Sequence, residues 1–173
     1  MVAVWTGKKA HIGLAAPGSD SCGSMALKSG TVMTSFMSYR GTVYAWHCDH
    51  VGHMNVMWYA AKFDEASWNF LAQTGITPSY LRKNERGMAA VQQNINYRRE
   101  LLSGDIVEVR SRLLEIGDKS IRCVHEMCNG ETGDLAAVSE LTAVHLDRRL
   151  RKSCPFTAEI RSAGEKLLSL QPA

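Results

Sequence analysis

The chain has 173 residues, of which 45% are hydrophobic and 21% are charged, and its 20 basic and 17 acidic residues give a formal net charge of +3. This length suits one domain with an ordinary hydrophobic core, and the composition excludes a fibrous or intrinsically disordered protein. Nucleic-acid binding would have to rest on a local basic patch, of which residues 148–152 are the densest. We therefore expect no nucleic-acid partner.

Targeting signals and cysteine content indicate the subcellular location. No stretch approaches the ~18 consecutive apolar residues of a membrane span, and the first residues lack the apolar core of a signal peptide. The five cysteines are odd in number and form no CxxC pair, which favours reduced thiols over a disulfide framework or a zinc finger. We predict a cytoplasmic protein without a membrane span.

The composition changes along the chain. Residues 1–35 are rich in Gly, Ser and Ala and show no sustained period of 2 or 3.6, which is typical of a poorly ordered extension. We expect one domain over residues 36–160 and a C-terminal tail over residues 161–173.

The domain begins with a strand and a long helix. Residues 36–46 (FMSYRGTVYAW) are dense in aromatic and β-branched residues, which predicts a strand. After Asn55, apolar residues recur at helical spacing as far as Leu71. We expect this helix to end at Gly75, with Pro78 just beyond it.

Everything after this helix alternates like strands. We predict four strands, over residues 88–99, 107–113, 121–127 and 135–147. The turns between them are short, which implies antiparallel pairing. A single apolar helix must be covered by the only sheet present, so we predict an α+β fold in which an antiparallel sheet of about five strands curls around a long central helix. Open sheet edges favour pairing of two copies, so we expect at least a homodimer.

The segment between the first strand and the helix, WHCDHVGHMN (residues 46–55), concentrates polar chemistry. Its possible metal ligands are His47, Cys48, His50 and His53. Adjacent residues of one loop rarely converge on a tetrahedral ion, and no HExxH helix is present. We predict no metal and no cofactor, and keep a metal-binding or acyl-binding module as an alternative.

The position of this segment favours a different chemistry. Asp49 lies just before a helix whose first backbone N–H groups have no partner within the helix. Those donors and the positive end of the helix dipole form a site for an oxyanion. A carboxylate beside such a site indicates acyl transfer.

These residues resemble a known family. The pattern consists of Asp49-x-x-Gly52-His53-x-Asn55, a helix with Tyr59 and Glu65-Ala66, and Tyr97-x-Arg99 before Gly104-Asp105. It resembles the hotdog-fold acyl-CoA thioesterases of the 4-hydroxybenzoyl-CoA thioesterase type, and the resemblance runs from about residue 36 to about residue 156. It implies a hotdog fold, an acyl-CoA substrate, and a homodimer or homotetramer. The chain departs from the family pattern at His47, where many relatives carry Asp, at Val56 and at Glu100.

The resemblance implies roles for individual residues. Asp49 would be the nucleophile or general base, and a backbone N–H near Val56 would be the oxyanion donor. His53 and Asn55 join the catalytic set, with loop bracing and helix capping as their favoured roles. The substrate-binding set is Gly52, Val56, Tyr59, Glu65 and Arg99. A thiolate with a pKa near ~8.5 can leave without a general acid, so one carboxylate could suffice.

Rival assignments remain open from the sequence. Glu65, on the helix, is the strongest competitor of Asp49, because a related hotdog subfamily uses a helix carboxylate. Cys48 has no defined base and is expected to be a bystander. If coenzyme A is the carrier, Arg99 and the basic residues of 148–152 are the best candidates to bind its phosphates. A hotdog enoyl-CoA hydratase using Asp49 and His53 is the alternative enzyme.

Overall fold

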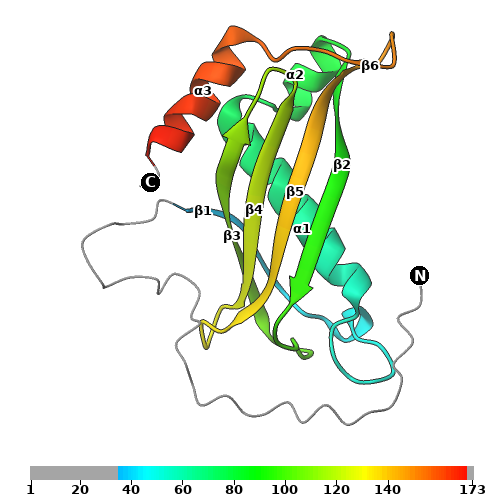
Figure 1. Cartoon of the computed structure of the whole chain (residues 1–173). Helices are drawn as coiled ribbons and strands as arrows, with labels where there is room; N and C mark the ends of the chain where they lie inside the picture. Colours follow the sequence, from blue (N-terminus) through cyan, green and yellow to red (C-terminus); the bar gives the residue numbers. More distant parts are fainter. Residues whose placement is uncertain (1–34, 171–173) are drawn as a thin grey trace.

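The computed structural model describes residues 35–170. The expected extension, except for residue 35, and the last three residues of the expected tail lie outside the described residues. One curved antiparallel sheet and one long helix, α1 (Val56–Leu71), form the body of the protein (Figure 1). The sheet has the order β1 (Phe36–Thr42), β3 (Ile106–Ile116), β4 (Ser120–Asn129), β5 (Leu135–Asp147) and β2 (Arg86–Tyr97), and β6 (Lys152–Ser153) pairs with β5. The predicted α+β architecture is confirmed.

The boundaries of α1 follow from its end residues. Asn55 caps the first turn by accepting a hydrogen bond from the backbone N–H of Met57. A 3₁₀ turn (Ala72–Thr74) continues the helix to Gly75, whose φ of +88° lies in the left-handed region that glycine adopts without strain. The predicted end of the helix at Gly75 is confirmed.

The core lies between α1 and the concave face of the sheet. Alternate residues of β3 are buried, as the period of 2 in its sequence predicts. The buried cluster under the first half of α1 includes Tyr59, Phe63, Ala66, Val107, Val109, Met127, Ala136 and Ala137. Burial of these side chains fixes how α1 sits across the sheet, and thereby where its first turn lies.

The structure contains two helices that the sequence analysis did not predict. Helix α2 (Pro78–Lys83) begins at a proline, which is favoured at the first helical position although it stops a helix elsewhere. Helix α3 (Ala158–Ser169) is capped by Thr157 and packs against β3, so the domain boundary expected at residue 160 falls inside this helix. The expected first strand is also shorter, because residues 45–47 form a 3₁₀ turn.

The two ends of α1 lie in different surroundings. The loop that precedes α1 lies at one end of the molecule, and α2 and α3 lie near the other (Figure 1). Strands β1 and β2 are the two edges of the sheet.

Of the helices that the structure describes, none is long and apolar enough to cross a membrane.

Candidate active site

The polar segment before α1 folds as a small β-hairpin. Cys48 pairs with Met54 in an antiparallel bridge, and the N–H of Asp49 donates to the carbonyl of His53 at 3.1 Å. At the tip, the N–H of Gly52 donates to the carbonyl of Asp49 at 3.0 Å. Gly52 has a φ of +95°, which a hairpin of this length requires at that position. Gly52 therefore shapes the turn.

The hairpin sorts its side chains onto two faces. Met54 is 1% exposed in the core, and Cys48 packs against the same hydrophobic cluster. Because neighbouring residues of a strand point to opposite faces, the residue after Cys48 and those on either side of Met54 point away from the core. Those residues are Asp49, His53 and Asn55.

Asp49 is held as a charged carboxylate. Its Oδ1 accepts the N–H of Val51 at 2.9 Å, and its Oδ2 accepts Nδ2–H of Asn55 at 3.1 Å. The hydrogen bond from Val51 is the main cause that lowers the pKa of Asp49, and the Asn55 amide and two nearby histidines add to it against some desolvation. Each oxygen retains a lone pair for a substrate or a water molecule.

The first turn of α1 leaves one backbone donor open. Asn55 Oδ1 accepts the N–H of Met57 at 3.0 Å, and the Asn55 carbonyl accepts the N–H of Trp58 at 2.9 Å. The hydrogen bonds of the described residues give the N–H of Val56 no acceptor. This N–H lies at the positive end of the helix dipole, one residue from the amide that holds Asp49.

His47 is buried between aromatic rings. It is 7% exposed, and its ring centroid lies 4.4 Å from that of Trp58 and 5.6 Å from that of Tyr44. Its Nδ1 accepts the N–H of Tyr44 at 3.1 Å. Burial is the main cause that lowers the pKa of His47, with a contribution from Lys62 that Glu65 opposes. His47 is therefore neutral near pH 7.

The other predicted site residues make separate contacts. His53 Nε2 lies 4.0 Å from Glu100 Oε1, at the limit of an ion pair. Tyr59 is 3% exposed, donates to the Arg99 carbonyl at 3.2 Å, and has its pKa raised by burial to about 12. Arg99 Nη1 lies 3.5 Å from Asp134 Oδ2. The hydrogen bonds of residues 35–170 join the Asp49 carboxylate to Val51 and Asn55, and to none of these side chains.

Glu65 lies on the exposed surface of α1. It forms no ion pair with any residue that the structure describes. It lies three residues after Lys62, on the side of α1 that faces β1.

Metal ligands do not converge in the described part of the chain. Residues 35–170 contain no group of three or more His, Cys, Asp or Glu side chains that could hold a metal ion. In the hairpin, Cys48 packs against the core cluster, whereas the ring of His47 lies between those of Tyr44 and Trp58. Cys48, Cys123 and Cys154 are free thiols as expected, whereas Cys128 is disulfide-bonded, contrary to the expectation for this residue.

Exposed apolar side chains lie on and beside the hairpin, and the sequence analysis did not predict them. The rings of Tyr44 and Trp46 are stacked with centroids 4.4 Å apart, and they are 50% and 67% exposed. The other exposed apolar residues of the hairpin and first helical turn are Val51, Val56 and Met57. Alternation of polar and apolar residues on both sides of Val51-Gly52 was the signal that could have revealed the hairpin.

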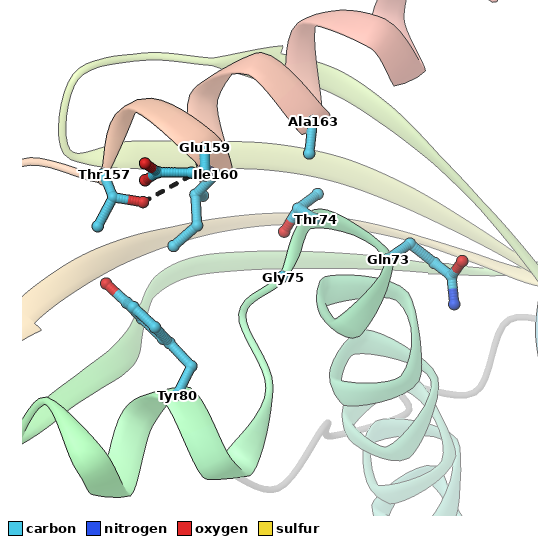
Figure 2. Close-up of a pocket in the computed structure, with 8 residues that line it drawn as sticks. All are labelled: Gln73, Thr74, Gly75, Tyr80, Thr157, Glu159, Ile160 and Ala163. Atoms are coloured by element: carbon cyan, nitrogen blue, oxygen red, sulfur yellow. Dashed lines mark hydrogen bonds between the residues drawn. The ribbon is translucent and has the colours of Figure 1, made fainter.

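A cavity near the other end of α1 offers a rival site. It has a volume of about 450 Å³ and lies between the end of α1, α2 and α3, and the Tyr80 side chain points into it (Figure 2). His145 Nδ1 lies 3.1 Å from the carbonyls of Cys154 and Pro155, which can only accept, so this nitrogen carries the proton. The Cys154 thiol lies 3.4 Å from the same nitrogen and has its pKa raised by burial. The protonated nitrogen of His145 cannot act as a base for the Cys154 thiol, and the hairpin is therefore the better candidate site.

Sequence comparisons identify the family of the chain. Residues 43–164 match the family described as the thioesterase-like superfamily. The betainyl-CoA thioesterase of Pseudomonas aeruginosa is 25% identical over 119 residues, which are 69% of this chain and 75% of that protein. The long-chain acyl-CoA thioesterase FadM of Escherichia coli is 25% identical over 126 residues, which are 73% of this chain and 95% of that protein.

Solved structures share the fold. A hypothetical protein from Staphylococcus aureus, described as in complex with CoA, superposes with a TM-score of 0.76 at 19% identity, over 84% of this chain and 90% of that one. The gentisyl-coenzyme A thioesterase BH1999 superposes with a TM-score of 0.65 at 25% identity, over 73% of this chain and 98% of that one.

Proposed function

Because the chain belongs to the thioesterase-like superfamily and has a hotdog fold, we propose that it hydrolyses an acyl-CoA to a free carboxylic acid and coenzyme A. The observation that carries the proposal is the arrangement of Asp49 and Val56. A charged carboxylate, held by Val51 and Asn55, precedes a helix whose first N–H is open.

The proposed chemistry needs only these two groups. Asp49 either attacks the thioester carbon directly or removes a proton from a water molecule that attacks it. In both routes the carbonyl oxygen becomes negative, and the N–H of Val56 donates a hydrogen bond to it. The carbon–sulfur bond then breaks, and the thiolate of coenzyme A leaves without a general acid because its pKa lies near ~8.5. In the direct route the acyl group is then joined to Asp49 as an anhydride, and a water molecule hydrolyses it to the free acid.

Neighbouring residues support this chemistry in the proposal. Asn55 holds Asp49 through its Nδ2 and caps α1 through its Oδ1, so one side chain fixes the base relative to the oxyanion donor. Gly52 forms the turn, and His53 braces the hairpin. Tyr59, Glu65 and Arg99 remain predicted substrate-binding residues, with Arg99 assigned to a phosphate of coenzyme A.

We further propose that the enzyme is a homodimer, or a pair of dimers, joined through β2. This strand has 12 residues, lies at a sheet edge and pairs only with β5 among the described strands. Val91 and Tyr97 on it are 60% and 48% exposed. A long open edge with exposed apolar residues is stable when a second copy covers it. Light scattering of the purified protein tests this proposal, and a monomer at micromolar concentration would contradict it.

A substrate panel tests the activity. Short, long, aromatic, betainyl and enoyl esters of coenzyme A are incubated with the protein, and free thiol is followed with a thiol-reactive dye. We expect thiol release, and we expect Asp49→Asn to lower kcat at least ~100-fold. Loss of enoyl absorbance without thiol release would favour the hydratase instead.

The cytoplasmic location of the protein stays a prediction, which fractionation of cells tests.

A further inference from the structure

The position of the proton on His47 can be derived from its contacts. A backbone N–H can only donate, so the Nδ1 that accepts the N–H of Tyr44 at 3.1 Å must carry a lone pair. A neutral imidazole carries one proton, and burial favours the neutral ring here. The proton of His47 therefore lies on Nε2.

This Nε2–H has no partner in the described structure. The hydrogen bonds of residues 35–170 include none from His47 Nε2. The same residues contain no buried side-chain nitrogen or oxygen without a hydrogen-bond partner. His47 Nε2 must therefore reach the surface, although the residue as a whole is only 7% exposed.

The donor is also fixed in direction. The ring lies over that of Trp58, with 4.4 Å between centroids and 43° between the planes, and it meets the Tyr44 and Trp46 rings nearly edge-on at 5.6 and 5.7 Å. With Nδ1 bonded to the backbone, the imidazole cannot flip without losing that bond. A donor held in this way loses little entropy when it binds a ligand.

The donor lies next to the first turn of α1. The ring of His47 packs on that of Trp58, the third residue of α1, with 4.4 Å between their centroids. Across the hairpin, the His47 carbonyl accepts the N–H of Asn55 at 2.9 Å. Asn55 in turn holds the Asp49 carboxylate.

We propose that His47 donates a hydrogen bond from Nε2 to the carbonyl oxygen of the bound thioester, as a second oxyanion donor beside the N–H of Val56. The inference rests on the proposed function. A neutral imidazole suits that role because it donates to the developing negative charge and keeps its proton.

Three substitutions separate the two nitrogens of the ring. His47→Phe keeps the aromatic packing and removes both nitrogens. His47→Asn keeps a polar group near Nδ1, and His47→Gln keeps a donor near Nε2. We expect Phe and Asn to lower kcat by ~100-fold to ~1,000-fold, the loss for one oxyanion donor, with KM within a few-fold, and Gln to retain more activity than Asn. Wild-type kcat in His47→Phe, or Asn retaining as much activity as Gln, would overturn the proposal.

A spectroscopic experiment covers variants that fail to fold. Wild-type protein labelled with ¹⁵N in histidine is titrated with carba(dethia)acetyl-coenzyme A, a ketone in which CH₂ replaces the thioester sulfur. We expect the His47 Nε2–H tautomer in the free protein and a shift of the Nε2 proton on binding. Saturation without that shift would overturn the proposal.

The two proposals can fail separately. Full activity of Asp49→Asn would overturn the proposed function. Loss of activity in Asp49→Asn together with wild-type kcat in His47→Phe would overturn only the role of His47.

Discussion

His47 and His125 are both buried and both neutral, but their hydrogen bonds differ. His47 is 7% exposed and His125 is 0% exposed, and burial lowers the pKa of each. His47 has one nitrogen bonded and one open. Both nitrogens of His125 are bonded inside the core, to Ser111 at 2.6 Å and to Ser67 at 3.0 Å.

The hydrogen bonds around His125 all lie inside the core. Its Nε2 lies 3.0 Å from the hydroxyl of Ser67, which donates to the Phe63 carbonyl at 2.7 Å. Its Nδ1 lies 2.6 Å from the hydroxyl of Ser111, which is 2.6 Å from that of Ser38. This series of bonds joins β1, β3 and β4 to α1 and leaves no donor for a ligand.

The difference shows which property marks a candidate site. Burial and a lowered pKa occur at both histidines, so neither property identifies chemistry by itself. His47, unlike His125, has an open, directed donor, and this donor lies next to the first turn of α1. The four predictions below test this division between a structural and a functional histidine. The first three are ordered by their expected effect on stability, from the largest to the smallest. The last concerns the role of Asp49 in turnover.

Removal of His125 should be costly for folding. His125→Ala leaves a cavity and unpaired serine hydroxyls, so we expect the free energy of unfolding to fall by about 3–5 kcal/mol, measured by urea denaturation. The folded fraction should keep wild-type kcat. His50→Ala, which removes an exposed histidine, is the matched control and should change stability little. A large kcat loss in folded His125→Ala would break the division.

Acid should destabilise the protein through His125. Its pKa falls from the ordinary 6.5 to about 4 because of burial. The unfolded chain therefore takes up this proton first, so the stabilisation is complete above pH ~6.5 and is lost as pH falls toward ~4, by about 3 kcal/mol in total. Urea midpoints across this range measure the loss. His125→Asn should lack this part of the pH dependence, and an identical acid profile in that variant would contradict the assignment.

Asn55 should show a mixed effect. Asn55→Ala removes the cap of α1 and the amide that holds Asp49. We expect a loss of ~1 kcal/mol in stability and up to ~100-fold in kcat. Thr157→Ala removes the equivalent cap of α3 and should cost similar stability with unchanged kcat. Equal kcat in both variants would show that Asn55 only caps the helix.

The sequence predicted the structure best where one physical effect, the burial of one face of an element, determines the pattern of residues. The period of 3.6 after Asn55 and the period of 2 in β3 each reflect one buried face, and both predictions are confirmed. The family resemblance, read from the hairpin and helix residues, is also confirmed. Helix α2 was missed because Pro78 fits the end signal of the preceding helix, whereas here it is the first residue of a new one.

The contacts of the candidate site depend on pairing that the sequence does not show directly. Asp49 and Asn55 meet because Gly52 turns the chain, and the tautomer of His47 depends on the N–H of Tyr44 three residues earlier. The hydrogen bonds of His125 join residues from four elements far apart in sequence. Local periodicity predicts elements, but it does not predict which atoms meet between them.

The most direct test of the proposed function compares Asp49→Asn with Asp64→Asn. Asp64 is an exposed carboxylate on α1, so the two variants make the same chemical change inside and outside the candidate site. With an acyl-CoA that the wild type hydrolyses, thiol release should fall at least ~100-fold in Asp49→Asn, at unchanged Tm, and stay at the wild-type rate in Asp64→Asn. Wild-type turnover by Asp49→Asn would contradict the account.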